Sequence, residues 1–126
     1  MTAIKTKKSD SYKTPEWILN MFGDWFDPCP YNENPIVDGL NIEWQHKTFI
    51  NPPYSNIIGW VEKAISENNK GKQIVLLLPL DCTTKWYRRL IEERAIIMFI
   101  GSRCVKFEGK NIARGHIFAI LLKDEI

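Results

Sequence analysis

The residues with the clearest chemical potential form the tetrapeptide Asn51-Pro52-Pro53-Tyr54, which follows an apolar run ending at Ile50. Chance should produce it in roughly one chain of this length in a few thousand. The Asn51 side-chain oxygen and the Pro52 carbonyl can accept hydrogen bonds from a planar amino group, and so stabilise the positive charge that develops when a methyl group arrives. Tyr54 can stack on a base. The tetrapeptide therefore indicates methylation of an exocyclic or amide nitrogen, and a strand-end turn with a core tyrosine is the structural alternative.

Composition restricts the chain to a small protein with one core. Its 126 residues are 44% hydrophobic, so we expect a single domain over residues 12–126 after a flexible basic tail at residues 1–11. The longest apolar stretches, residues 74–80 and 95–100, are far too short to span a membrane, and the lysine-rich start has no apolar segment behind it to form a signal peptide. The sequence therefore predicts a cytoplasmic protein without membrane association.

The cysteines and histidines predict neither disulfides nor a metal site. Cys29, Cys82 and Cys104 are odd in number and widely spaced, and neither His46 nor His116 lies at ligand spacing from them. We expect reduced thiols, with Cys29 packed in the core. No metal is predicted.

The net charge of +2 gives no sign of a nucleic-acid partner, so local basic clusters must carry that prediction. Lys85, Arg88 and Arg89 form one cluster, and Arg103 belongs to a second one. Phosphate contacts by such groups would add salt-sensitive affinity without sequence preference. An ordinary solvated helix face and loop is the structural alternative for both clusters.

Apolar spacing and turn residues predict the elements that position these side chains. Helices are expected from Thr14, as a cap before Pro15, to Gly23; from about Trp60 to Gly71; and from about Thr84 to Glu93. Strands are expected at residues 25–26, 40–44, 48–51, 74–79, 96–100, 105–107 and 117–122. Four tryptophans are expected in the core, namely Trp17, Trp25, Trp44 and Trp60.

The alternation of strands and helices predicts an α/β fold with a mostly parallel sheet flanked by helices. In such a sheet, ligands bind at the carboxyl ends of the strands. Asp27, Asn51 and Pro79 all stand at predicted strand ends. We therefore expect the functional site to form there.

Several ordered motifs make the chain, from residue 12 onward, similar to the phage-type DNA N6-adenine methyltransferases, the Dam-like proteins with an Asn-Pro-Pro-Tyr motif. Those motifs are Tyr12-Lys13-Thr14-Pro15 before a helix, Phe26-Asp27-Pro28-Cys29, Asp38-Gly39-Leu40 ahead of Trp44, and Phe49 to Ser55 ahead of Trp60. The resemblance implies a compact Rossmann-like methyltransferase fold. It also implies S-adenosylmethionine as the methyl donor and DNA as the substrate.

The resemblance also implies which residues contact the cofactor. Thr14 and Pro15 would lie along its methionine part, Asp27 and Pro28 near its amino acid or ribose groups, and Asp38 near its adenine or ribose. Each of these polar residues also has a purely structural explanation: Thr14 as a helix cap, and Asp27 and Asp38 as turn residues. Many methyltransferases carry a glycine-rich turn after the first acidic strand end, whereas residues 29–34 contain no glycine.

Three classes of function therefore stay open. The first is N6 methylation of adenine in DNA, which an asparagine at position 51 favours. The second is methylation of another planar nitrogen, such as cytosine N4, a guanine in RNA or a glutamine side chain in a protein. The third is an inactive methyltransferase-like module that binds nucleic acid. Because no room exists for a separate recognition domain between Asp27 and Asn51, sequence preference would come from short loops or from a second protomer in a homodimer.

Overall fold

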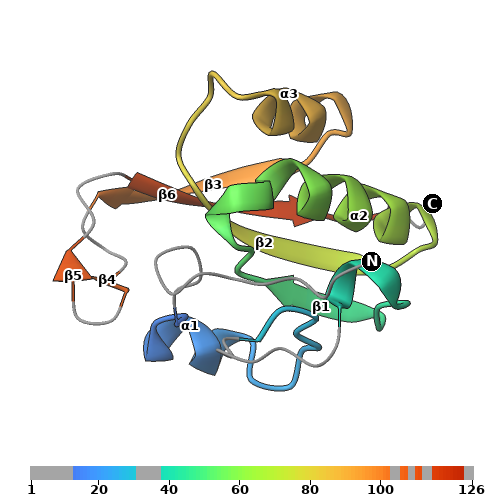
Figure 1. Cartoon of the computed structure of the whole chain (residues 1–126), viewed down its shortest axis with the longest axis horizontal. Coiled ribbons are helices and arrows are strands. Elements are labelled where there is room, and N and C mark those ends of the chain that lie inside the picture. Colours follow the sequence, from blue (N-terminus) through green and yellow to red (C-terminus); the bar gives the residue numbers. More distant parts are fainter. Residues whose placement is uncertain (1–12, 31–37, 103–105, 108–109, 112–114, 124–126) are drawn as a thin grey trace.

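The computed structural model describes residues 13–30, 38–102, 106–107, 110–111 and 115–123. It is an α/β structure in which α2 (Ile57–Asn69) and α3 (Lys85–Glu92) cover one face of a four-stranded sheet and α1 (Glu16–Met21) lies on the other (Figure 1). The predicted basic tail, Arg103 and Cys104 lie outside the described residues.

The sheet is mixed, and the prediction of a mostly parallel sheet is wrong. Its strands are β1 (Lys47–Ile50), β2 (Gln73–Pro79), β3 (Ile96–Ser102) and β6 (Gly115–Leu121), in the order β1-β2-β6-β3. β1 pairs parallel with β2, whereas β6 is antiparallel to both β2 and β3. The described parts of the connection from β3 to β6 are the paired two-residue strands β4 (Lys106–Phe107) and β5 (Lys110–Asn111), not a crossover helix. The chain therefore returns antiparallel, a direction that apolar runs do not encode.

Two predicted short strands near the N-terminus do not form as expected. Of residues 25–26, only Phe26 pairs, in a single parallel bridge with Thr48. The strand predicted for residues 40–44 is wrong, because Gly39–Asn41 forms the 3-10 helix η1, with the Asp38 carboxylate accepting from the Leu40 N–H. The Trp44 N–H is bonded to Glu67 instead of a strand partner.

The helices agree with the sequence pattern except at two N-termini. α3 begins where it was predicted, after Thr84, whose hydroxyl caps the helix by accepting from the Tyr87 N–H. α2 begins earlier than predicted, at Ile57, because Asn56 accepts from the Gly59 N–H and ends the preceding 3-10 helix η2 (Tyr54–Asn56). Thr14 does not cap α1, whose N-cap is Pro15 without a side-chain hydrogen bond. The Thr14 hydroxyl is therefore available for a different contact.

The core has two parts, one on each face of the sheet. The larger part lies under α2 and α3 and includes the stacked rings of Trp44 and Trp60, whose centroids are 6.2 Å apart. Cys29 packs against it, as predicted. The smaller part lies under α1 and contains Ile18. The assignment of Trp17 to the core is wrong: its side chain is 45% exposed, because Ile18 is the residue of the short α1 that is buried. Trp25 is partly buried against the smaller part of the core.

The described residues show neither a membrane-spanning helix nor a cluster of metal ligands. None of the helices they form is both long and apolar enough to cross a bilayer. They also contain no group of three or more His, Cys, Asp or Glu side chains placed to hold a metal ion.

Candidate functional site

The predicted site residues lie at one edge of the sheet. Asn51 follows the last residue of β1, Pro79 ends β2, and Asp27 follows the parallel bridge of Phe26 to β1. These three segments run in the same direction, so their carboxyl ends meet at a common edge, on the left in Figure 1. This is the position at which open α/β sheets bind ligands.

The side chain of Asn51 is fixed by a residue near the N-terminus. Its Nδ2 donates to the Thr14 Oγ1 at 3.1 Å, across 37 positions of sequence. Because the amide nitrogen points to Thr14, Oδ1 is the acceptor that the carboxamide can present. The contact also brings together a residue predicted to bind the cofactor and a residue predicted to bind the target, as methyl transfer between the two would require.

The backbone after Asn51 is held on both sides. Pro52 and Pro53 are buried, and their rings restrict φ. Pro53 caps η2, and its carbonyl accepts from the Asn56 N–H at 3.3 Å. The tetrapeptide therefore joins the buried strand β1 to η2, of which Tyr54 is the first residue, and this limits its movement.

Tyr54 has a partner that the sequence did not indicate. Its hydroxyl lies 3.1 Å from the Nε2 of His116, which is on β6 and only 1% exposed. His116 pairs with Pro79 across the sheet, at the same carboxyl edge. From the sequence we considered His116 only as a metal ligand. The usable signal was its position directly before the apolar run predicted as a strand at residues 117–122, where a buried polar side chain requires a partner.

Asp27 is a carboxyl group in an unfavourable environment. Burial raises its pKa to about 6, although a hydrogen bond from the Cys29 N–H to Oδ1, at 2.8 Å, acts in the opposite direction. Ionised, this group lacks the solvation it would have in water. A ligand that supplies hydrogen-bond donors or positive charge would therefore be favoured beside it.

The glycine that follows Asp38 allows its loop to pass close to the loop of Asp27 and Pro28. A Cβ on the buried Gly39 would lie 2.0 Å from the Pro28 carbonyl oxygen, so only glycine permits this approach. The Gly39 carbonyl in turn accepts from the indole Nε1 of Trp44 at 2.7 Å. The two loops that carry predicted cofactor residues therefore pass close to each other at Gly39 and Pro28. Tyr31 to Val37, between them, lie outside the described residues.

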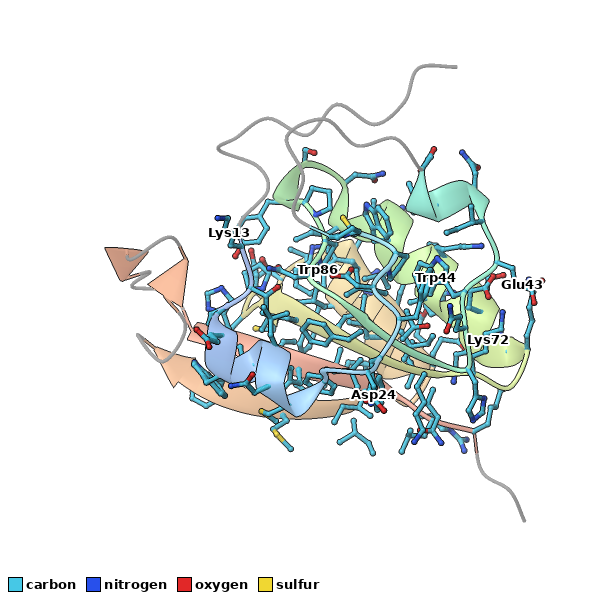
Figure 2. The ribbon with its side chains drawn as sticks, turned by 90° about the horizontal axis from the view of Figure 1, so that it is seen from below. Lys13, Asp24, Glu43, Trp44, Lys72 and Trp86 are labelled. Carbon is cyan, nitrogen blue, oxygen red and sulfur yellow. The ribbon has the colours of Figure 1, made fainter. Side chains whose placement is uncertain are left out.

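The backbone of Trp44, whose indole binds Gly39, is bound in turn by a charge network centred on the buried Glu67. Glu67 is completely buried, and its carboxylate accepts from the Trp44 N–H at 3.1 Å and from Lys63 at 2.9 Å, Lys70 at 3.2 Å and Lys72. Burial alone would raise the pKa of Glu67, but these hydrogen bonds together lower it to about 2. Figure 2 shows Trp44 and Lys72 close together at one end of the molecule.

The predicted DNA-contacting residues of α3 fall into two groups. Lys85 and Arg88 are exposed. Arg89 instead binds Glu62 of α2 through two nitrogens, at 2.6 and 3.1 Å, and also Glu92 at 3.0 Å. The hydrogen bond from Arg89 lowers the pKa of Glu62, and the bonds to Glu62 and then Glu92 raise the pKa of Arg89. Arg89 therefore connects α2 to α3.

Comparison with known proteins identifies the family. The model of the DNA N-6-adenine-methyltransferase (Dam) family matches residues 1–117. A DNA N-6-adenine-methyltransferase of Haemophilus phage HP1 (strain HP1c1) is 31% identical over 125 residues, which cover 85% of this chain and 72% of the relative. One from Escherichia phage T1 is 32% identical over 74 residues, 58% of this chain and 31% of the relative. These matches confirm the resemblance found in the motifs: the chain belongs to the DNA N-6-adenine-methyltransferase (Dam) family.

Proposed function

We propose that this chain transfers a methyl group from S-adenosylmethionine to the N6 amino group of adenine in DNA. The observation that carries the proposal is the Asn51-Pro52-Pro53-Tyr54 segment at the carboxyl edge of the sheet, with the Asn51 amide bound to Thr14. Family membership supports adenine in DNA over cytosine N4, RNA guanine or protein glutamine, and supports an enzyme over an inactive binding module.

The target amino group would be held by acceptors alone. The Asn51 Oδ1 and the Pro52 carbonyl accept from its two N–H groups and draw the nitrogen toward a tetrahedral geometry, which makes the lone pair available. The same oxygens would stabilise the positive charge on nitrogen as its bond to the methyl carbon forms and the bond from that carbon to the donor sulfur breaks. The sulfur would leave as a neutral thioether, and the methylated nitrogen would then lose one N–H proton to water. Tyr54 stacks on the base, and this stacking energy of about 1–3 kcal/mol offsets part of the cost of extruding the base from the duplex. Pro53 fixes the backbone between the acceptors and the ring.

The residues around the N-terminal loops fit the donor groups of the cofactor. S-adenosylmethionine carries an ammonium group and ribose hydroxyls, and it supplies an electrophilic methyl group when bound. The Asp27 and Asp38 carboxylates and the Thr14 hydroxyl are acceptors for such donors, and the raised pKa of Asp27 means that a cationic or donor ligand relieves an existing cost. Pro15 and Pro28 stiffen the backbone on either side.

DNA would be positioned by the exposed part of the basic cluster. We assign phosphate contacts to Lys85 and Arg88, because the guanidinium of Arg89 is already paired with carboxylates. Arg103 remains a predicted contact outside the described residues. The predicted homodimer would form along β3, the edge strand of the sheet, which exposes the apolar side chains of Ile96, Met98 and Phe99. Light scattering would test whether the protein is a dimer.

An Asn51→Ala substitution tests the proposed chemistry. Turnover should fall by roughly two to three orders of magnitude, because an acceptor acting on transition-state charge is removed. Affinity for S-adenosylmethionine, measured by calorimetry, should stay nearly unchanged. Asn69→Ala, at the far end of α2 where Asn69 contacts Lys123, is the matched control and should retain full turnover.

The product identifies the substrate. Unmethylated DNA, RNA and a protein extract would each be incubated with labelled S-adenosylmethionine, and nucleosides from the reaction would be separated by mass spectrometry. We expect N6-methyladenine from DNA. Label confined to cytosine, RNA or protein would overturn the proposal, and full turnover by Asn51→Ala would remove the catalytic role of that residue.

A further inference from the structure

His116 is a buried polar residue that neither the sequence motifs nor the family resemblance assigns to a role. It lies on β6, between β2 and β3, and is followed by the buried residues Ile117 and Phe118. An imidazole in such surroundings loses its hydration and must recover it through hydrogen bonds. Its Nε2 recovers one from the hydroxyl of Tyr54, 62 positions away in sequence.

The strand β3, which pairs with β6 opposite His116, has an irregular backbone at that point. The pairing of β3 with β6 shifts register between Phe99 and Gly101, so that His116 lies opposite Gly101. Gly101 has φ +93°, a conformation that other residues rarely adopt. Bulges of this kind redirect side chains beside active sites. The irregularity therefore coincides with the one histidine that reaches the tetrapeptide.

We propose that His116 is a positioning residue: it holds the hydroxyl of Tyr54 so that the tyrosine ring presents its face to the extruded adenine. This inference rests on the proposed function. His116 touches neither the base nor the methyl group, and its effect passes through Tyr54. It fixes the ring before the base arrives, so that less conformational freedom is lost when the base stacks.

A pair of isosteric substitutions separates this role from mere packing. Glutamine places its terminal amide where the Nε2 of histidine lies, so His116→Gln keeps a partner for Tyr54. Asparagine reaches only the Nδ1 position, so His116→Asn loses it. We expect His116→Asn to raise the KM for DNA by roughly 3- to 10-fold, the equivalent of one ordinary hydrogen bond. The kcat at saturating DNA and the affinity for S-adenosylmethionine should change little, and His116→Gln should restore the KM.

Combination with Tyr54→Phe shows whether the effect passes through the hydroxyl. Tyr54→Phe keeps the stacking ring but lacks the hydroxyl, so adding His116→Asn to it should raise the KM no further. Equal effects of the Asn and Gln variants, or effects of the two sites that add, would overturn the proposal. Thermal unfolding of each variant identifies losses that arise from misfolding.

A measurement without catalysis keeps the inference separate from the proposed function. Nitrogen NMR of the imidazole ring should show the Nε2 resonance of His116 moving in Tyr54→Phe, since its hydrogen-bond partner is removed. An unmoved resonance would overturn the positioning role even if the enzyme methylates adenine. Conversely, a moved resonance in a protein that methylates no adenine would overturn both the proposed function and the part of this inference that concerns the base.

Discussion

Replacing Asp27 with asparagine should make the protein more stable and a weaker binder of its cofactor. Asparagine has the same shape and keeps Oδ1 as the acceptor for the Cys29 N–H, so the substitution removes little besides the charge. Burial raises the pKa of Asp27 from 3.8 to about 6. This rise in pKa corresponds to about 3 kcal/mol of unfolding free energy, which the protein loses when Asp27 is ionised in the folded state.

The sign of the pH dependence follows from this pKa. Well below pH 3.8, Asp27 is protonated in both the folded and the unfolded chain, and its ionisation has no effect on stability. Between 3.8 and about 6 the unfolded chain releases its proton first, so the free energy of unfolding of the wild type falls as pH rises. Above about pH 6 the loss is complete. The Asp27→Asn variant lacks this loss.

Urea unfolding at a series of pH values from 4 to 8 measures the effect. The difference in unfolding free energy between Asp27→Asn and wild type should grow as pH rises to about 6 and then level off, at up to about 3 kcal/mol in favour of the variant. Calorimetry at pH 7.5 should show S-adenosylmethionine binding weakened by about 1–3 kcal/mol. Asp24→Asn, at an exposed carboxylate of the same loop (Figure 2), is the control for charge alone.

Two outcomes would contradict the reasoning about Asp27. A stability difference that stays constant from pH 4 to pH 8 would show that burial does not raise its pKa. Unchanged affinity for S-adenosylmethionine in the folded variant would show that the carboxylate does not contact the cofactor, whatever its effect on stability.

Three further predictions concern the framework of the site. Glu67→Gln should destabilise the protein by roughly 3–5 kcal/mol in urea unfolding at pH 7, because it removes the buried carboxylate that pairs with Lys63 and Lys72, whose side chains are only 18% and 11% exposed. Since the pKa of Glu67 is lowered to about 2, the stability that its carboxylate adds should be complete above about pH 4.5 and should shrink as pH falls toward 2. Gly39→Ala should weaken S-adenosylmethionine binding in calorimetry at least tenfold, because its Cβ collides with the Pro28 carbonyl and separates the two loops; unaltered binding would disprove their coupling. Arg88→Leu should flatten the salt dependence of DNA binding and leave stability unchanged, whereas Arg89→Leu should lower the melting temperature with little effect on that salt dependence. The reverse pattern would show that Arg89 is the phosphate contact.

Local signals in the sequence were sufficient for the position of the Asn51–Tyr54 tetrapeptide and for most elements around it. An apolar run before Asn51 predicts a buried strand, and β1 ends at Ile50. Thr84 before the basic segment predicts the start of α3, and its hydroxyl forms the cap. These features depend on residues a few positions apart. Residue type and spacing therefore determine them without knowledge of the rest of the chain.

Tertiary structure decided the features that depend on residues far apart in sequence. The direction of β6 follows from the path of the chain after β3, which apolar runs do not record, so the sheet is mixed. Thr14, which has the sequence signature of a helix cap, binds Asn51 instead, because folding brings the two together. The partner of Tyr54 lies 62 residues away, and Arg89 faces Glu62 across two helices. A residue's type shows which bonds it can form, but only the folded chain determines which partner is within reach.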